Sequence, residues 1–185
     1  MLHMEQKDYK MEIVLWLLNK RGHIRAIAEE MGINHMMIVR KLKELQKENV
    51  VDYVQEGKNK TYFLKKNIEA KSHVFSAEAY KLKKIVEKYP QLRNVIEKIQ
   101  NDRRIKIALL FGSYAKRIAK QDSDIDVYIE TADKKIKQEI SLIDSKLNIK
   151  IGKYNNSNLL IKEIEKNHVV IKGIENYYEK NKFFE

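Results

Sequence analysis

The sequence predicts a chain of two domains with mixed α+β and α/β structure. In the N-terminal part, apolar residues recur at helical spacing in three short segments, and two β-type segments around a turn follow them. In the C-terminal part, apolar strand segments alternate with amphipathic helical segments, which is typical of a sheet layer flanked by helices. We therefore expect a helical domain with a β-hairpin, followed by a mixed β-sheet with helices on its faces.

The N-terminal domain, residues 1–70, is expected to contain three helices and then two strands, over residues 8–20, 24–31, 35–48, 50–55 and 61–64. Gly32 lies between the second and third helices, where glycine can adopt the positive φ that ends a helix. Asn34 follows and can cap the third helix through its side-chain oxygen. The residues between the two strands, Glu56-Gly57-Lys58-Asn59, are typical of a hairpin turn.

A helical linker, residues 71–104, is expected to join the two domains. Ser76 can cap a helix that runs through Lys88, and Pro90 can begin another helix in its first turn. The C-terminal domain, residues 105–185, follows the linker. Its expected strands lie over residues 104–111, 124–130, 147–151 and 169–173. Its expected helices lie over residues 132–146 and 158–166 and at the C-terminal end.

Composition narrows the classes of function. The chain of 185 residues carries a formal net charge of +11, which suits a polyanionic partner such as nucleic acid or nucleotide, although a lysine-rich background gives the same balance. It contains no cysteine, which excludes disulfides, cysteine-based zinc sites and thiol nucleophiles. The early apolar run Ile13–Leu18 is too short for a secretion signal or a membrane span. We therefore expect a soluble cytoplasmic protein with no membrane partner.

The segment "IRAIAEEMGINHMMIVRKLKELQKENVV" and the hairpin "VDYVQEGKNKTYFL" resemble the winged helix-turn-helix family of transcription regulators, over residues 8–65. The resemblance implies that the third helix enters the major groove of DNA and that the hairpin, or wing, contacts the backbone. Such modules also serve in protein docking and dimerisation, and a homodimer is the expected state. The candidate DNA-binding residues lie on the outward side of the third helix and on the wing: His35, Met36, Arg40, Lys41, Lys43, Lys58 and Lys60.

The segment "LLFGSYAKRIAKQDSDIDVYIE", residues 109–130, carries the strongest chemical signal. Gly112-Ser113 is followed by ten residues and then by Asp124 and Asp126, two apart on an expected strand, so that both carboxylates point to one face. Oxygen ligands of this kind suit Mg²⁺ or Mn²⁺ bound to a polyphosphate. Gly112 allows the backbone to approach phosphates closely, and Ser113 can donate hydrogen bonds to them.

This pattern resembles the nucleotidyltransferase superfamily that includes DNA polymerase β, and particularly the minimal nucleotidyltransferases of prokaryotes. The resemblance implies Mg²⁺-dependent transfer of a nucleoside monophosphate from a nucleoside triphosphate, with ATP the expected nucleotide, to a hydroxyl of a protein or small molecule. Asp124 and Asp126 would be the catalytic, metal-binding pair, and Lys116 or Arg117 could neutralise pyrophosphate charge. Stand-alone minimal members often act as antitoxins, so the resemblance also implies a toxin-like protein partner.

Two departures from the family pattern affect the expected activity. Arg117 stands where the family usually has glycine, and the next strand offers Asn148 or Lys150 where the family has a third carboxylate. Glu130 shares the strand face of the aspartates but lies about 13 Å from Asp126 at the usual rise per residue. The alternative is therefore a non-catalytic, DNA-binding transcription regulator whose degenerate nucleotidyltransferase domain senses nucleotides.

Overall fold

The computed structural model describes residues 7–185, which divide into two compact units. The first comprises the chain up to Ala77 together with Phe184 and Glu185, and the second runs from Glu78 to Phe183. Within the described residues, none of the helices has the length and apolar character that a membrane span requires.

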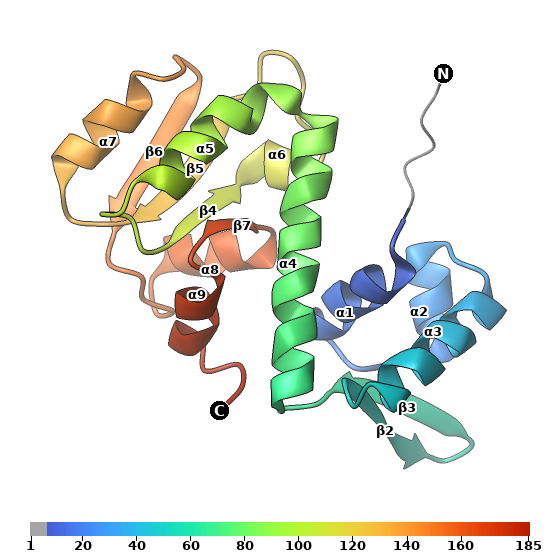
Figure 1. Ribbon diagram of the computed structural model, residues 1–185. Coiled ribbons are helices and arrows are strands. Elements are labelled where there is room, and N and C mark those ends of the chain that lie inside the picture. The colour runs from blue at the N-terminus through green and yellow to red at the C-terminus, as the bar shows by residue number, and fades with distance from the viewer. Residues whose placement is uncertain (1–6) are drawn as a thin grey trace. The chain divides into compact units, whose positions relative to one another are not determined.

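The first unit combines three helices with a small antiparallel sheet (Figure 1). The helices are α1 (Tyr9–Asn19), α2 (Ile24–Met31) and α3 (His35–Lys47). The strands β1 (Gly22–His23), β2 (Val51–Glu56) and β3 (Asn59–Leu64) pair in the order β1-β3-β2. This arrangement is the expected winged helix-turn-helix, with β2 and β3 forming the wing.

Local sequence explains the turn between α2 and α3. Gly32 adopts φ +61°, the left-handed conformation that favours glycine, and its N–H donates to carbonyls at the end of α2. Asn34 then caps α3, because its side-chain oxygen accepts the Met36 N–H at 2.8 Å. Apolar side chains of all three helices and of the wing are buried together: Ile13, Val14, Leu17, Ile27, Ile38, Leu42, Leu45, Val51, Tyr62 and Leu64.

Strand β1 was not predicted from the sequence. Its two residues pair with β3, Gly22 opposite Tyr62 and His23 opposite Thr61. Gly22 is packed against the indole of Trp16, where an added Cβ would lie 2.4 Å from a ring carbon. A two-residue strand has no alternating pattern to detect, so only the completed sheet shows it.

The expected helix start at Ser76 is wrong. Helix α4 (Ile68–Lys88) begins eight residues earlier, because Asn67 caps it by accepting the Ala70 N–H at 2.9 Å. Ser76 lies inside the helix, where its hydroxyl donates to the Ser72 carbonyl at 3.0 Å. The boundary between the two compact units falls within α4, after Ala77.

The second unit is built on a four-stranded mixed sheet with the order β6-β5-β4-β7. Strands β5 and β6 are parallel, whereas β4 is antiparallel to both β5 and β7. This confirms the expected mixed sheet flanked by helices. In chain order its elements are η1 (Pro90–Leu92), α5 (Arg93–Asn101), β4 (Ala108–Phe111), α6 (Gly112–Ala115), β5 (Ile125–Glu130), α7 (Lys134–Ser141), β6 (Leu147–Gly152), α8 (Leu159–Lys166), β7 (Val169–Lys172) and α9 (Ile174–Lys180).

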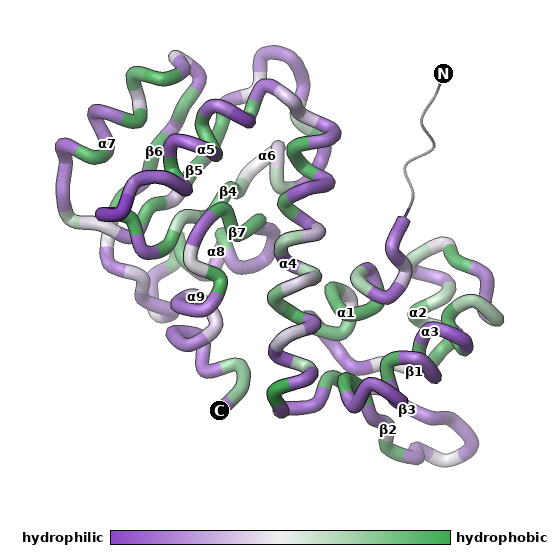
Figure 2. Tube along the Cα trace, in the orientation of Figure 1, coloured by the Kyte–Doolittle hydropathy of each residue, from purple (hydrophilic) through white to green (hydrophobic). Residues whose placement is uncertain are grey.

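One face of this sheet holds the main core. Ile125, Val127 and Ile129 of β5 point to this face and pack with apolar residues of α5 and α7. Strands β4 and β7 are hydrophobic over most of their length (Figure 2). Because β5 alternates, its other face carries Asp126, Tyr128 and Glu130.

Helices α8 and α9 lie toward that other face (Figure 1). The Tyr128 ring contacts Tyr154, which in turn contacts Tyr177 of α9, and burial raises the pKa of Tyr128 to about 12. His168 packs against Tyr177, and burial lowers its pKa to about 3, so this histidine is neutral at physiological pH. Aromatic packing therefore fills the far end of this face, and the end near Asp126 remains polar.

Candidate active site and nucleic-acid interface

The turn after β4 is shaped by one close contact. Gly112 adopts φ +69°, and a Cβ placed on it would lie 2.2 Å from Oδ2 of Asp126. The antiparallel register explains this contact, because Phe111 pairs with Asp126 across β4 and β5. Only glycine satisfies both the left-handed backbone and the absence of space beside the carboxylate.

Asp126 is half-buried and has a second neighbour on its other side. Strand β6 places Asn148 directly opposite it, and the Asn148 amide donates to Oδ1 of Asp126 at 2.7 Å. Asp124 is exposed and immediately precedes β5, one residue outside the strand that we expected to include it. Ile125 between them is buried, so the two aspartates lie on the polar side of the sheet edge.

Helix α6 is a single turn, and Ser113 is its second residue. The chain after it is held by backbone bonds, in which Arg117 donates to Tyr114 and Ile118 donates to Ser113, both at 3.0 Å. Lys116 is exposed; it lies close enough to α8 to help Lys166 lower the pKa of Glu163.

Arg117, which stands where the family pattern usually has glycine, adopts a backbone conformation that favours glycine. Its φ is +61°, a left-handed conformation that costs a residue with a Cβ roughly 1–2 kcal/mol. The Arg117 carbonyl accepts a hydrogen bond from Nζ of Lys88, at the end of α4, at 2.6 Å. This bond helps to hold the loop in its left-handed conformation.

Lys150 and Glu130, the other residues considered for the place of a third ligand, do not join Asp124 and Asp126. Lys150 lies two residues beyond Asn148 on β6, opposite Tyr128, and is exposed. Oε1 of Glu130 accepts the Tyr154 N–H at 3.2 Å and also contacts Lys180. Across residues 7–185, there is no cluster of three or more histidine, cysteine, aspartate or glutamate side chains that could hold a metal ion.

The donor set still fits one hard divalent ion. Magnesium in nucleotide sites commonly uses one or two carboxylates and completes its shell with phosphate oxygens and water. Asp124 and Asp126 supply such carboxylates beside the Gly112-Ser113 turn. The set does not fit a site with two ions held by three carboxylates.

On the first unit, the outward side of α3 is basic and open. His35, Met36, Arg40 and Lys43 are exposed, and Met36 is 69% exposed. Lys41 lies on the flank of the helix, where its Nζ forms an ion pair with Glu44 at 2.7 Å. The structure therefore brings four of the five α3 candidates to the open side and places Lys41 beside it.

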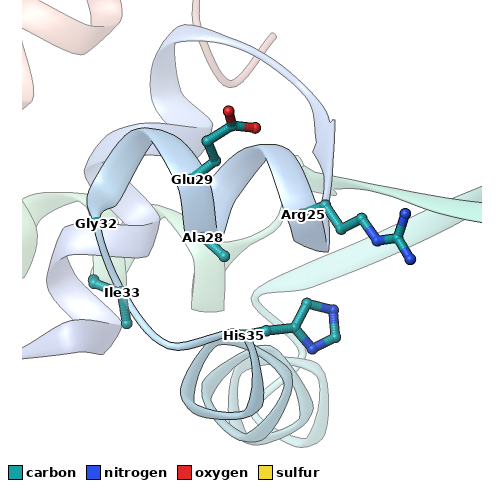
Figure 3. A pocket seen from close by; sticks show the side chains of 6 residues that line it. All are labelled: Arg25, Ala28, Glu29, Gly32, Ile33 and His35. Carbon is teal, nitrogen blue, oxygen red and sulfur yellow. The ribbon is translucent and has the colours of Figure 1, made fainter.

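Two adjoining pockets extend this surface toward α2 and the wing. One, of about 750 Å³, is lined by α2 and the turn before α3, and Arg25 and His35 project to the same side of it (Figure 3). The other, of about 450 Å³, also includes both wing lysines, Lys58 and Lys60. Lys60 lies over the Tyr53 ring, 4.0 Å from its centroid.

His23, Arg25 and Gln55 line these pockets and were missed in the sequence analysis. Arg25 is exposed in the first turn of α2; its charge was visible in the sequence, but its place beside α3 was not. His23 accepts the Ala26 N–H on Nδ1 at 3.1 Å, so its neutral form carries a proton on Nε2. Both side chains can therefore donate to an anion such as a phosphate.

Comparison with known proteins gives one family match. The family model described as "Polymerase beta, Nucleotidyltransferase" matches residues 93–176. No curated protein matches the sequence.

Two solved structures are distantly similar to the chain. The adhesin competence repressor AdcR from Streptococcus pyogenes is 13% identical with a TM-score of 0.40, over 50% of this chain and 69% of that chain. A mutant form of ZitR from Lactococcus lactis is 17% identical with a TM-score of 0.38, over 51% of this chain and 64% of that chain. Likenesses at these scores carry no argument about function. The family match spans the four strands of the second unit's sheet, the Gly112-Ser113 turn and both aspartates, so this segment is similar to nucleotidyltransferase domains of the polymerase β type.

Proposed function

We propose that the chain is a nucleotidyltransferase that moves a nucleoside monophosphate from a nucleoside triphosphate to a hydroxyl group, and that its winged helix-turn-helix binds DNA. One observation carries the first part: the carboxylate of Asp126 lies against the left-handed Gly112, within the segment that matches the nucleotidyltransferase family. This contact supports the proposal because it sets an acidic side chain beside a half-buried glycine-serine turn.

In this proposal, the triphosphate lies along the Gly112-Ser113 turn. The Ser113 hydroxyl and amide donate to phosphate oxygens, and the exposed Lys116 adds positive charge near the pyrophosphate. Asp124 and Asp126 would hold Mg²⁺, or Mn²⁺, which neutralises phosphate charge when bound. ATP is the proposed nucleotide.

The reaction forms one bond and breaks one. The acceptor hydroxyl oxygen bonds to the α-phosphorus, the bond from that phosphorus to the pyrophosphate oxygen breaks, and the hydroxyl proton passes to water. Such a transfer depends mainly on placement and charge neutralisation, which a rigid turn and fixed carboxylates supply. The proposed acceptor is a protein or small-molecule hydroxyl, and a toxin-like protein partner is one such acceptor.

A second function is favoured by Asn148. An amide replaces the third carboxylate beside Asp126, so the domain can bind nucleotide and signal its presence without transferring it. The chain would then be a DNA-binding regulator that senses nucleotides.

Nucleotide transfer is the first test. The wild-type chain, incubated with α-labelled ATP, Mg²⁺ and candidate protein or small-molecule acceptors, should transfer label, and Asp124→Asn/Asp126→Asn should lose both transfer and nucleotide binding. Asp122→Asn is the matched control, because it removes an exposed carboxylate from the same loop and should behave as wild type. Binding without transfer to any acceptor would support the sensor instead, and absence of nucleotide binding to wild type would contradict both functions.

The Gly112 turn gives a second prediction. Gly112→Ala should weaken ATP binding by about tenfold or more, because the new Cβ must displace the Asp126 carboxylate from the turn. Isothermal titration calorimetry measures the affinity, and thermal melting confirms folding. Gly57→Ala is the control: it imposes the same left-handed strain at φ +60° with nothing within 4 Å, and it should leave ATP affinity unchanged. Unchanged affinity in Gly112→Ala would argue against the site.

DNA binding is tested on the α3 surface. Arg40→Ala/Lys43→Ala should weaken binding to a short DNA duplex and reduce the slope of log K against log salt by about 2, since each lost phosphate contact removes about 1. Arg25→Ala alone should reduce it by about 1. Lys98→Ala/Lys137→Ala, which removes two exposed lysines from the other unit, controls for net charge. Equal loss in the control pair would show that the α3 surface is not the binding face.

A further inference from the structure

Resting on the proposed nucleotide function, we infer that Asn148 limits the site to a single divalent ion, because its amide occupies the Asp126 oxygen that a second ion would need.

The two carboxylate oxygens of Asp126 have different neighbours. Oδ2 lies on the side of Gly112, where an added Cβ would approach it to 2.2 Å. Oδ1 lies on the side of β6 and accepts the Asn148 amide at 2.7 Å. Parallel pairing of β5 and β6 puts the two residues directly opposite each other, and both are half-buried, so the contact is held by the sheet itself.

The chemistry of the two oxygens then differs. Two ions that clamp one phosphoryl group lie about 3.5–4 Å apart and need carboxylates that reach both of them. An N–H donor occupies a lone pair of Oδ1 and presents partial positive charge where the second ion would lie. Oδ2 and the exposed Asp124 remain for one ion beside the Gly112-Ser113 turn.

The charge balance of the site also favours a single ion. Two divalent ions would bring four positive charges to a pair of carboxylates, without the third carboxylate that the family pattern supplies. Lys150, exposed on the same side of β6 as Asn148, adds another positive charge two residues further along the strand. No third acidic residue within the described part of the chain joins the pair as a metal ligand.

Ion stoichiometry tests this directly. The full chain is saturated with a non-hydrolysable ATP analogue and titrated with Mn²⁺, and bound ions are counted from the loss of the free-Mn²⁺ electron paramagnetic resonance signal, with the nucleotide alone as the blank. Wild type should bind one ion per chain. Asn148→Asp should bind two, and its spectrum should show the coupling of two Mn²⁺ ions about 4 Å apart.

Asn155→Asp is the matched control. It adds the same charge to an exposed loop of the same unit, and the new side chain can still accept the Ser157 N–H, so it should bind one ion like wild type. Thermal melting gives a second readout: Asn148→Asp brings two carboxylates together without metal, so Mn²⁺ with nucleotide should raise its Tm more than that of wild type.

The contrary outcomes are distinct. Two ions bound by wild type, or one ion and an unchanged Mn²⁺-induced Tm shift in Asn148→Asp, would overturn the inference while leaving the proposed nucleotide site in place. Neither nucleotide nor ion bound by wild type would overturn the proposed function and this inference together.

Discussion

The side chain of Asp126 lies between two elements that the sheet brings to it, and the geometry of the whole candidate site depends on this placement. Antiparallel pairing with β4 sets the Gly112 turn against one carboxylate oxygen, and parallel pairing with β6 sets Asn148 against the other. Ile125 and Val127, the neighbours of Asp126 on β5, are buried in the main core, so the strand cannot shift by one residue and move Asp126 to that face without exposing them. Hydrophobic packing on one face of β5 therefore positions polar chemistry on the other.

Spacing predicted that Asp124 and Asp126 lie on one side of a strand. That the Gly112-Ser113 turn faces them was implied by the resemblance to nucleotidyltransferases, and the contact of Gly112 with Asp126 agrees with it. Spacing could not decide between Asn148 and Lys150, since both lie on the same side of one strand. That choice depends on the register between β5 and β6, which is set by the packing of the whole sheet.

The other differences between the structure and the sequence-based predictions also arise from contacts between residues that are distant in the sequence. Strand β1 exists only because β3 supplies its partner, and α4 begins early because Asn67 caps it where Ser76 had been expected to do so. On the first unit, helical phase identified the open side of α3 but could not show that Arg25 of α2 adjoins it. At Arg117, the sequence showed a departure from the family pattern, whereas only the structure shows that this arginine has a left-handed backbone.

The central claim is that Asp124, Asp126 and the Gly112-Ser113 turn form one site for a nucleotide and its divalent ion. Anomalous X-ray diffraction from crystals grown with Mn²⁺ and a non-hydrolysable ATP analogue tests it most directly. The account predicts an anomalous peak within coordination distance, about 2.2 Å, of an oxygen of each aspartate and of the triphosphate, with the phosphates along the turn. Nucleotide density without a peak between the two aspartates, or nucleotide bound elsewhere on the chain, would contradict it.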